Sequence, residues 1–250
     1  MTEILAIINQ KGGVGKSTTA HALGAGLRRR RKRVLFVDLD AQGNLTYALN
    51  APETAVSGMD VLQGSVSAGQ AIIATPQGEL LPHGPALAGA DIALTDTGKE
   101  FRLREALATV AVNYDYIIID TPPALGILTI NALTASSGAI IPAQADIFSL
   151  QGIGQLYATL CAVRKYTNPQ LTIKGIVLTR YNARAVLSRD IADMLEETAQ
   201  KLETVVFKTK IRECIALKES QVRREDIFTY GPKSNAALDY AALVKEFLKA

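Results

Sequence analysis

Glycine, lysine and hydroxyl side chains lie close together near the start of the chain, in a spacing that could hold phosphate groups. Residues 11–18 read Lys-Gly-Gly-Val-Gly-Lys-Ser-Thr, after an apolar run and before a helix-compatible segment. The glycines let successive backbone N–H groups turn inward onto a phosphate chain at a helix N-terminus. Lys16 would reach the β- and γ-phosphates, and the Ser17 hydroxyl would ligate Mg²⁺. The nucleotide-binding residues predicted in this loop are Gly12, Gly13, Val14, Gly15, Lys16, Ser17 and Thr18.

Three aspartates follow apolar runs that are typical of buried strands. The run 34–38 ends in Asp38, with Asp40 two residues later, and the run 116–120 ends in Asp120. Ligands of open parallel sheets bind outside the carboxyl ends of the strands, so these acids should face the phosphates. Asp38 and Asp40 could instead form a turn or cap a helix, and Asp120 could be a purely structural strand end.

The elements that must hold these residues alternate between strand and helix. Further apolar runs at 138–142 and 173–179 favour strands, and the segments between the strands have helical patterns. This alternation predicts an α/β fold, with a mainly parallel twisted sheet and helices on both faces. At 250 residues the chain fits a single domain spanning 1–250.

Two amphipathic helices are predicted in the C-terminal part. The first has Ser188 as its N-cap, and its apolar face consists of Ile191, Met194, Leu195 and Leu202. The second covers 235–248, and its apolar stripe consists of Leu238, Ala241, Ala242 and Phe247. Such stripes are typical of helices that pack against a core.

Charge and hydropathy limit the classes of function. The net charge of +3 is too small to establish a polyanion partner. The six consecutive cations Arg28–Arg33 either complement a helix C-terminus or contact nucleic acid. No apolar run is long enough to span a bilayer, and the first strand leaves no room for a signal peptide, so we expect a cytoplasmic protein. Cys161 and Cys214 lack metal-ligand spacing.

Lys11 distinguishes the loop from an ordinary phosphate loop, which has no need of a lysine at its start. The string from Lys11 to Thr18 resembles the deviant Walker A motif of the ParA/MinD group of ATPases. The resemblance implies that Lys11 crosses a dimer interface to the partner's nucleotide. It therefore adds Lys11 to the nucleotide-binding residues and makes Lys11, Lys16 and Asp40 the catalytic ones.

The acidic segments resemble two further motifs of this group. The segment from Asp38 to Gln42 is similar to a D-x-D-x-Q pattern, with Ala41 where the family usually has proline. The pattern implies that Asp40 positions the attacking water and that Asp38 lies nearer the metal. Asp120 and its following loop resemble Walker B and a second switch, so Asp120 would hold a water on Mg²⁺. The implied metal-site residues are Ser17, Asp38 and Asp120.

The resemblance covers nearly the whole chain and indicates a short, Soj-like partition ATPase. It implies ATP and Mg²⁺ as cofactors, and an ATP-sandwich homodimer that binds double-stranded DNA without sequence preference. Slow hydrolysis, stimulated by a ParB-like partner, would release the DNA during chromosome, plasmid or mobile-element segregation. The protein would be cytoplasmic and nucleoid-associated, without membrane contact. Because the chain begins directly with strand one, no N-terminal helix-turn-helix extension is expected.

Contacts to the base and to DNA are implied by the resemblance alone. Thr179 and Arg180 follow a strand and resemble the family's region near the nucleotide base. Arg184 matches an arginine that the family uses for DNA binding, whereas the second such position holds alanine here. Arg212 and Lys218 flank that alanine and could supply the missing cation, because phosphate contacts require only a cation within reach.

Two other classes of function stay open at this point. A MinD-like membrane-cycling ATPase would need a basic amphipathic C-terminal tail, whereas this sequence stops after a core-like helix. A metabolic ligase of the dethiobiotin-synthetase type would use the same loop with a small-molecule acceptor. Such a ligase gives no reason for Lys11.

Overall fold

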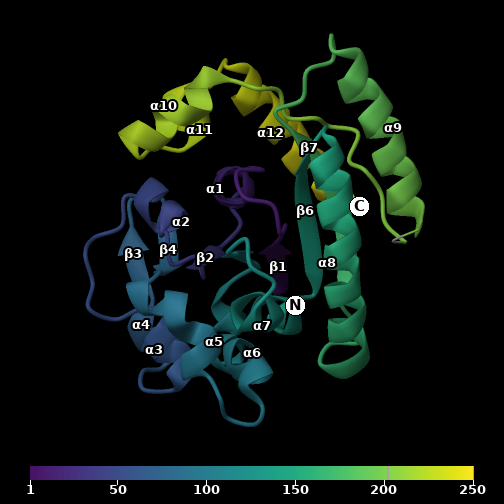
Figure 1. The fold of residues 1–250 in the computed structure, drawn as a ribbon. Coiled ribbons are helices and arrows are strands. Elements are labelled where there is room, and N and C mark those ends of the chain that lie inside the picture. The colour runs from purple at the N-terminus through teal and green to yellow at the C-terminus, as the bar shows by residue number, and fades with distance from the viewer. Residues whose placement is uncertain (202, 250) are drawn as a thin grey trace.

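A seven-stranded sheet runs through the middle of the molecule (Figure 1). The computed structural model describes residues 1–201 and 203–249, so Leu202 of the predicted apolar face lies outside it. The strand order is β3-β4-β2-β5-β1-β6-β7, and β3 with β4 is the antiparallel pair in an otherwise parallel sheet. The strands are β1 (Glu3–Ile7), β2 (Val34–Asp38), β3 (Ile73–Thr75), β4 (Gly78–Leu81), β5 (Tyr116–Asp120), β6 (Gly138–Gln144) and β7 (Thr172–Thr179). The predicted α/β fold is confirmed.

Helices cover both faces of this sheet. The helices are α1 (Lys16–Arg29), α2 (Asn44–Ala48), α3 (Gly58–Gln63), α4 (Ala68–Ala71), α5 (Ala90–Ala93), α6 (Arg102–Ala108), α7 (Ile127–Ala135), α8 (Ile147–Tyr166), α9 (Val186–Lys201), α10 (Ile215–Arg223), α11 (Ile227–Tyr230) and α12 (Asn235–Phe247). Helices α1, α11 and α12 pack on one face, and α6, α7 and α8 pack on the other. Within the described residues, no helix combines the length and the apolar character that crossing a membrane requires.

Side chains of the central strands alternate between two apolar clusters, one on each face. In β1, Leu5 and Ile7 belong to the cluster with α1 and α12, and Ala6 belongs to the cluster with α7 and α8. In β5, Ile118 belongs to the cluster with α1 and α12, and Ile119 belongs to the cluster with α7 and α8. Strands with apolar residues on both faces are stable only when both faces are covered, which explains the parallel, doubly covered sheet.

The register of the three central strands brings the predicted motifs to one edge of the sheet. Asp120 at the end of β5 pairs with Asp38 at the end of β2 and with Ile7 at the end of β1. The glycine-rich loop follows β1 directly. Three motifs that lie far apart in the sequence therefore meet at the carboxyl ends of adjacent strands, with α10 beside α2 at the same edge (Figure 1).

The predicted start of α9 is wrong. Helix α9 begins at Val186, so Ser188 lies inside its first turn. The helix follows directly on a turn in which the Ala185 N–H donates to the Asn182 carbonyl. Ser188 is therefore not the N-cap. Within the predicted apolar face, Met194 is 46% exposed, whereas Ile191 and Leu195 are buried.

The apolar stripe predicted for α12 is wrong at three of its four positions. Leu238, Ala241 and Ala242 face outward, and the buried face consists of Ala236, Ala237, Tyr240, Leu243, Val244 and Phe247. Tyr240 accounts for this rotation of the helix, because its ring is fully buried and its hydroxyl lies 3.2 Å from the Thr19 hydroxyl of α1. A large side chain with a buried hydrogen-bond partner sets the helix face more strongly than alanines do.

Candidate nucleotide-binding site

The loop between β1 and α1 has backbone conformations that glycine adopts without strain. Gly13 and Gly15 have φ angles of 74° and 89°, in the left-handed region. A Cβ atom added to Gly12 or Gly13 would meet no atom within 4 Å, so this stretch borders open space. Helix α1 begins at Lys16, and the N–H groups of its first turn have no intrahelical acceptors. The loop is therefore built as an anion-binding cradle.

Lys16 is buried beside this cradle with few partners for its charge. Its Nζ atom donates to the Lys11 carbonyl at 3.2 Å. Burial lowers the pKa of Lys16, and the negative charges of Asp120 and Asp40 act in the opposite direction. A buried ammonium group is stabilised by anions, so this position favours the binding of phosphate groups.

Asp120 provides the clearest sign that the site is suited to a metal ion. It is fully buried, yet neither carboxylate oxygen has a hydrogen-bond partner in the described part of the chain. Burial raises its pKa well above the ordinary value, Asp38 raises it further, and Ser17 and Lys16 lower it. An orphaned buried carboxylate is costly, and water molecules on Mg²⁺ would satisfy it. Ser17 and Asp120 therefore fit a Mg²⁺ ion held largely by phosphate and water oxygens.

Asp38, in contrast, already has protein partners for both oxygens. Its Oδ2 atom accepts bonds from the Thr46 N–H and hydroxyl at 2.8 and 2.7 Å, and its Oδ1 atom accepts one from the Asp40 N–H at 3.1 Å. Burial raises its pKa, while these bonds lower it. Asp38 thus shapes the loop that carries Asp40, and its predicted place near the metal stays a prediction.

A cavity of about 660 Å³ opens beside these residues. A smaller cavity of about 80 Å³ shares Gly15, Thr18, Arg180, Lys218 and Gln221 with it. The larger cavity combines the predicted loop with residues that are remote in sequence: Gly12, Gly13, Gly15, Lys16, Ser17, Thr18, Asp40, Gln42, Asn44, Tyr47, Ala48, Pro123, Arg180, Lys218, Gln221 and Val222. Asp40 therefore lines the same space as the phosphate loop, and its catalytic role stays a prediction.

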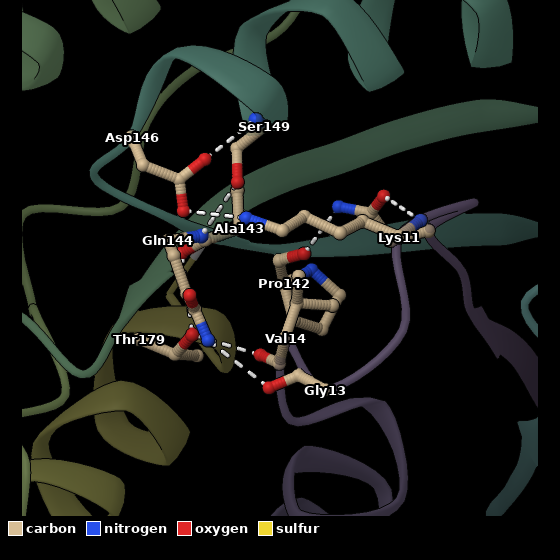
Figure 2. A network of polar contacts seen from close by, with 10 residues as sticks. Lys11, Gly13, Val14, Pro142, Ala143, Gln144, Asp146, Ser149 and Thr179 are labelled. Atoms are coloured by element: carbon tan, nitrogen blue, oxygen red, sulfur yellow. Dashed lines mark hydrogen bonds and ion pairs between the residues drawn. The ribbon is translucent and has the colours of Figure 1, made fainter.

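Lys11 extends away from the loop toward the start of α8, as Figure 2 shows. Its Nζ atom forms an ion pair with Asp146 Oδ2 at 2.5 Å and lies 5.8 Å from the centre of the Phe148 ring. Asp146 also caps α8, since its Oδ1 atom accepts a bond from the Ser149 N–H at 2.9 Å. Lys11 is thus held within its own chain and does not point into the phosphate cradle.

The residues predicted to contact the base differ in their availability. The Thr179 hydroxyl donates to the Val14 carbonyl at 2.8 Å, so Thr179 holds the phosphate loop in place (Figure 2). Arg180 lines both cavities and has a positive φ angle of 49°. Arg180 is therefore the better placed of the two for contact with a nucleotide.

The three residues predicted to bind DNA do not share one environment. Arg184 is exposed in the loop before α9. The Arg212 guanidinium donates to both oxygens of Asp239, with its Nη2 atom 2.7 Å from Oδ1, so its charge is already paired. Lys218 lines both nucleotide-side cavities. Arg184 is thus the candidate whose surroundings best fit a DNA contact.

Several residues of the site carry no signal in the sequence. Gln144 donates to the Gly13 carbonyl at 3.0 Å (Figure 2), and Gln221 of α10 donates to the Thr18 hydroxyl at 2.9 Å. A lone glutamine belongs to no motif. Asp146 could be predicted as a helix cap from the serine three residues later, but its pairing with Lys11 depends on the fold.

The fold and the site together define a P-loop nucleotide-binding protein of the α/β class. Residues 2–173 match a family model described as an AAA domain. The chain is 43% identical to the sporulation initiation inhibitor protein Soj of Bacillus subtilis, over 98% of each chain. It is 37% identical to the chromosome partitioning protein ParA of Myxococcus xanthus, over 98% of this chain and 88% of that one. The chain therefore belongs to the Soj and ParA family of partition ATPases.

A solved structure agrees with this fold and with the predicted cofactors. Cobyrinic acid a,c-diamide synthase from Mycobacterium smegmatis, with bound ADP and magnesium, superimposes with a TM-score of 0.86. The two sequences are 37% identical, and the match covers 100% of this chain and 95% of that one. The phosphate loop, Ser17 and Asp120 of this chain are suited to the same two ligands, an adenine nucleotide and magnesium.

Proposed function

We propose that this protein is an ATPase that moves DNA during partition, cycling between an ATP-bound dimer and a released monomer. The observation that carries the proposal is the orphaned Asp120 carboxylate, which lies at the strand end next to the one from which the phosphate loop starts, with Lys11 at the beginning of that loop. The identity to Soj over the full chain supports the partition role.

Each part of the site has a task in hydrolysis of ATP to ADP and phosphate. The loop N–H groups and Lys16 bind the phosphates. Ser17 and, through a water molecule, Asp120 would hold Mg²⁺, which would neutralise phosphate charge. Asp40, which lines the cavity, orients the attacking water. The resemblance to partition ATPases supports slow turnover that is suited to a switch.

Dimerisation brings Lys11 of each chain to the nucleotide of the other. In the isolated chain, Lys11 and Asp146 are 28% and 31% exposed, so their ion pair is partly screened by water. Exposed pairs of this kind contribute about 0.2–1 kcal/mol. A nucleotide phosphate from a second copy offers a stronger partner, and Lys11 changes from Asp146 to that phosphate when the dimer forms.

The dimer binds double-stranded DNA through cations, without reading its sequence. Arg184 is the first candidate because it is exposed. Lys218 and Arg212 stay candidates, and Arg28–Arg33 at the end of α1 is the alternative surface. Phosphate contacts of this kind are independent of sequence and weaken as salt rises.

A ParB-like protein on the cargo stimulates hydrolysis and releases the dimer from the DNA. We assign this cycle to the cytoplasm, with the protein associated with the nucleoid, and assign the catalytic domain to residues 1–250. DNA binding with ATP, ADP and no nucleotide tests the proposal. Binding that requires ATP supports it, and equal binding in all three conditions contradicts it.

The other classes of function make different predictions for the same purified chain. A MinD-like protein would sediment with anionic liposomes in the presence of ATP. A metabolic ligase, such as the synthase named for the M. smegmatis structure, would consume ATP only with a small-molecule acceptor. Retention on DNA with ATP, without liposome binding and without an acceptor, separates the partition ATPase from both.

A further inference from the structure

A single glutamine joins three elements around the nucleotide cavity. Gln77 lies in the turn between β3 and β4, at the edge of the sheet. Its Nε2 atom donates to the Ala48 carbonyl at 2.8 Å and to the Arg224 carbonyl at 2.9 Å. Its Oε1 atom lies 2.7 Å from His21 Nε2. One side chain therefore contacts the end of α2, the end of α10 and the middle of α1.

Two of the elements that Gln77 joins, α2 and α10, contribute to the cavity lining. Tyr47 and Ala48 of α2 line the cavity, and so do Lys218, Gln221 and Val222 of α10. Helix α10 ends at Arg223. Its C-cap, Arg224, has a positive φ angle of 53° and places its guanidinium 4.2 Å from the centre of the Tyr47 ring. Gln77 thus ties together the carbonyl ends of two helices that enclose the nucleotide.

The hydrogen bonds fix the orientation of the Gln77 amide and place a proton on His21 Nε2. Two carbonyl oxygens need N–H donors, so the NH₂ group must face Ala48 and Arg224 and the oxygen must face His21. His21 then donates from Nε2 to Gln77 Oε1. Burial lowers the pKa of His21, and the contact with Gln77 and the charge of Asp226 raise it.

We propose that Gln77 is a positioning residue that closes the nucleotide cavity by holding α10 against α2. Without its two N–H donors, the Ala48 and Arg224 carbonyls lose their shared partner, and α10 moves Lys218 and Gln221 away from the phosphate loop. The inference rests on the nucleotide site described above. Gln77 contacts neither the nucleotide nor the reacting atoms, but it lowers the rate at which the nucleotide dissociates.

Gln77→Glu is the sharpest test, because glutamate has the same shape but brings an oxygen to the two carbonyls. The affinity for fluorescent ADP should fall roughly tenfold, with most of the change in the dissociation rate. The carboxylate would also favour a protonated His21, so the pKa of His21 should rise. The chain has two histidines, so NMR titration of their ring protons resolves this change.

A matched control is available in Gln70→Glu, which makes the same chemical change in α4. The Gln70 Oε1 atom accepts bonds from the Ser67 N–H and hydroxyl, and glutamate can accept both. This variant should bind ADP like the wild type. Gln77→Ala, which buries no charge, provides a second test if Gln77→Glu fails to fold.

The outcomes separate this inference from the assignment of the site itself. Wild-type chain that binds no ADP would refute the nucleotide site. Wild-type binding that is lost in Lys16→Ala and weakened in folded Gln77→Ala supports both assignments. Folded Gln77→Ala or Gln77→Glu with wild-type ADP affinity and dissociation rate overturns the role of Gln77 alone.

Discussion

The two sides of the nucleotide cavity are built in different ways. The phosphate loop is local: eight consecutive residues follow one strand and open one helix, and the loop conformation depends on its own glycines. The α10 side is assembled from distant parts, because α10 is held beside the cavity by contacts between residues remote in sequence, among them Gln221 on Thr18 and Gln77 on Arg224. The local side determines whether a nucleotide binds, and the assembled side determines how firmly it is enclosed.

Removing the cation of the local side should have the largest effect. Lys16→Ala deletes the buried ammonium group that faces Asp120 and Asp40. Charge-assisted hydrogen bonds to the phosphates are lost, so ATP affinity should fall roughly 100-fold, measured by calorimetry. Circular dichroism should show a folded chain. ATP affinity equal to that of the wild type would remove Lys16 from the site.

Asp40→Ala should abolish chemistry while leaving binding intact. Asp40 lines the cavity, and its side-chain Oδ1 atom accepts a hydrogen bond from the Gln42 N–H at 3.0 Å. Loss of a group that positions the attacking water should lower the hydrolysis rate roughly 100-fold or more. The measurement is phosphate release at saturating ATP. Unchanged release would show that Asp40 has no part in the reaction.

Charge reversal at Arg184 should affect DNA without affecting the nucleotide. Arg184→Glu should weaken binding to all DNA sequences alike and reduce the log–log salt slope by about one for each lost contact. ADP affinity is the internal control, because Arg184 does not line the cavity. Lys218→Glu should weaken both activities. If Arg184→Glu bound DNA with wild-type affinity, Arg184 would not be a DNA contact, and Arg28–Arg33 would be the surface to test next.

The smallest predicted effect concerns the ion pair of Lys11. Asp146→Asn keeps a side chain that can cap α8 but removes the charge that holds Lys11. With Lys11 free, ATP-driven dimerisation should become tighter by up to about fivefold, the range expected for a partly exposed pair. Asp146→Ala also removes the cap and serves as the comparison. Weaker dimerisation of a folded Asp146→Asn variant would mean that Asp146 supports the dimer instead.

The sequence predicts the local side well and the assembled side poorly, for physical reasons. The strand ends at Ile7, Asp38 and Asp120 follow from apolar runs, and parallel pairing then brings them together. The face of α12 was not predictable from apolar spacing, because the hydrogen bond between Tyr240 and Thr19 joins residues 221 positions apart. The ties made by Gln77 and the neutralisation of Arg212 by Asp239 likewise depend on contacts that only the folded chain creates.

DNA binding and the transfer of Lys11 to a second nucleotide both require an ATP-dependent dimer. The mass of the protein in solution tests this dimer most directly. The Asp40→Ala variant should hold ATP without consuming it, so light scattering during size-exclusion chromatography can compare ATP with ADP. The chain has a mass of 26.7 kDa. With ATP and Mg²⁺ the account predicts twice this mass, and with ADP it predicts the single-chain value. A single-chain mass in ATP, at concentrations that saturate binding, would contradict it.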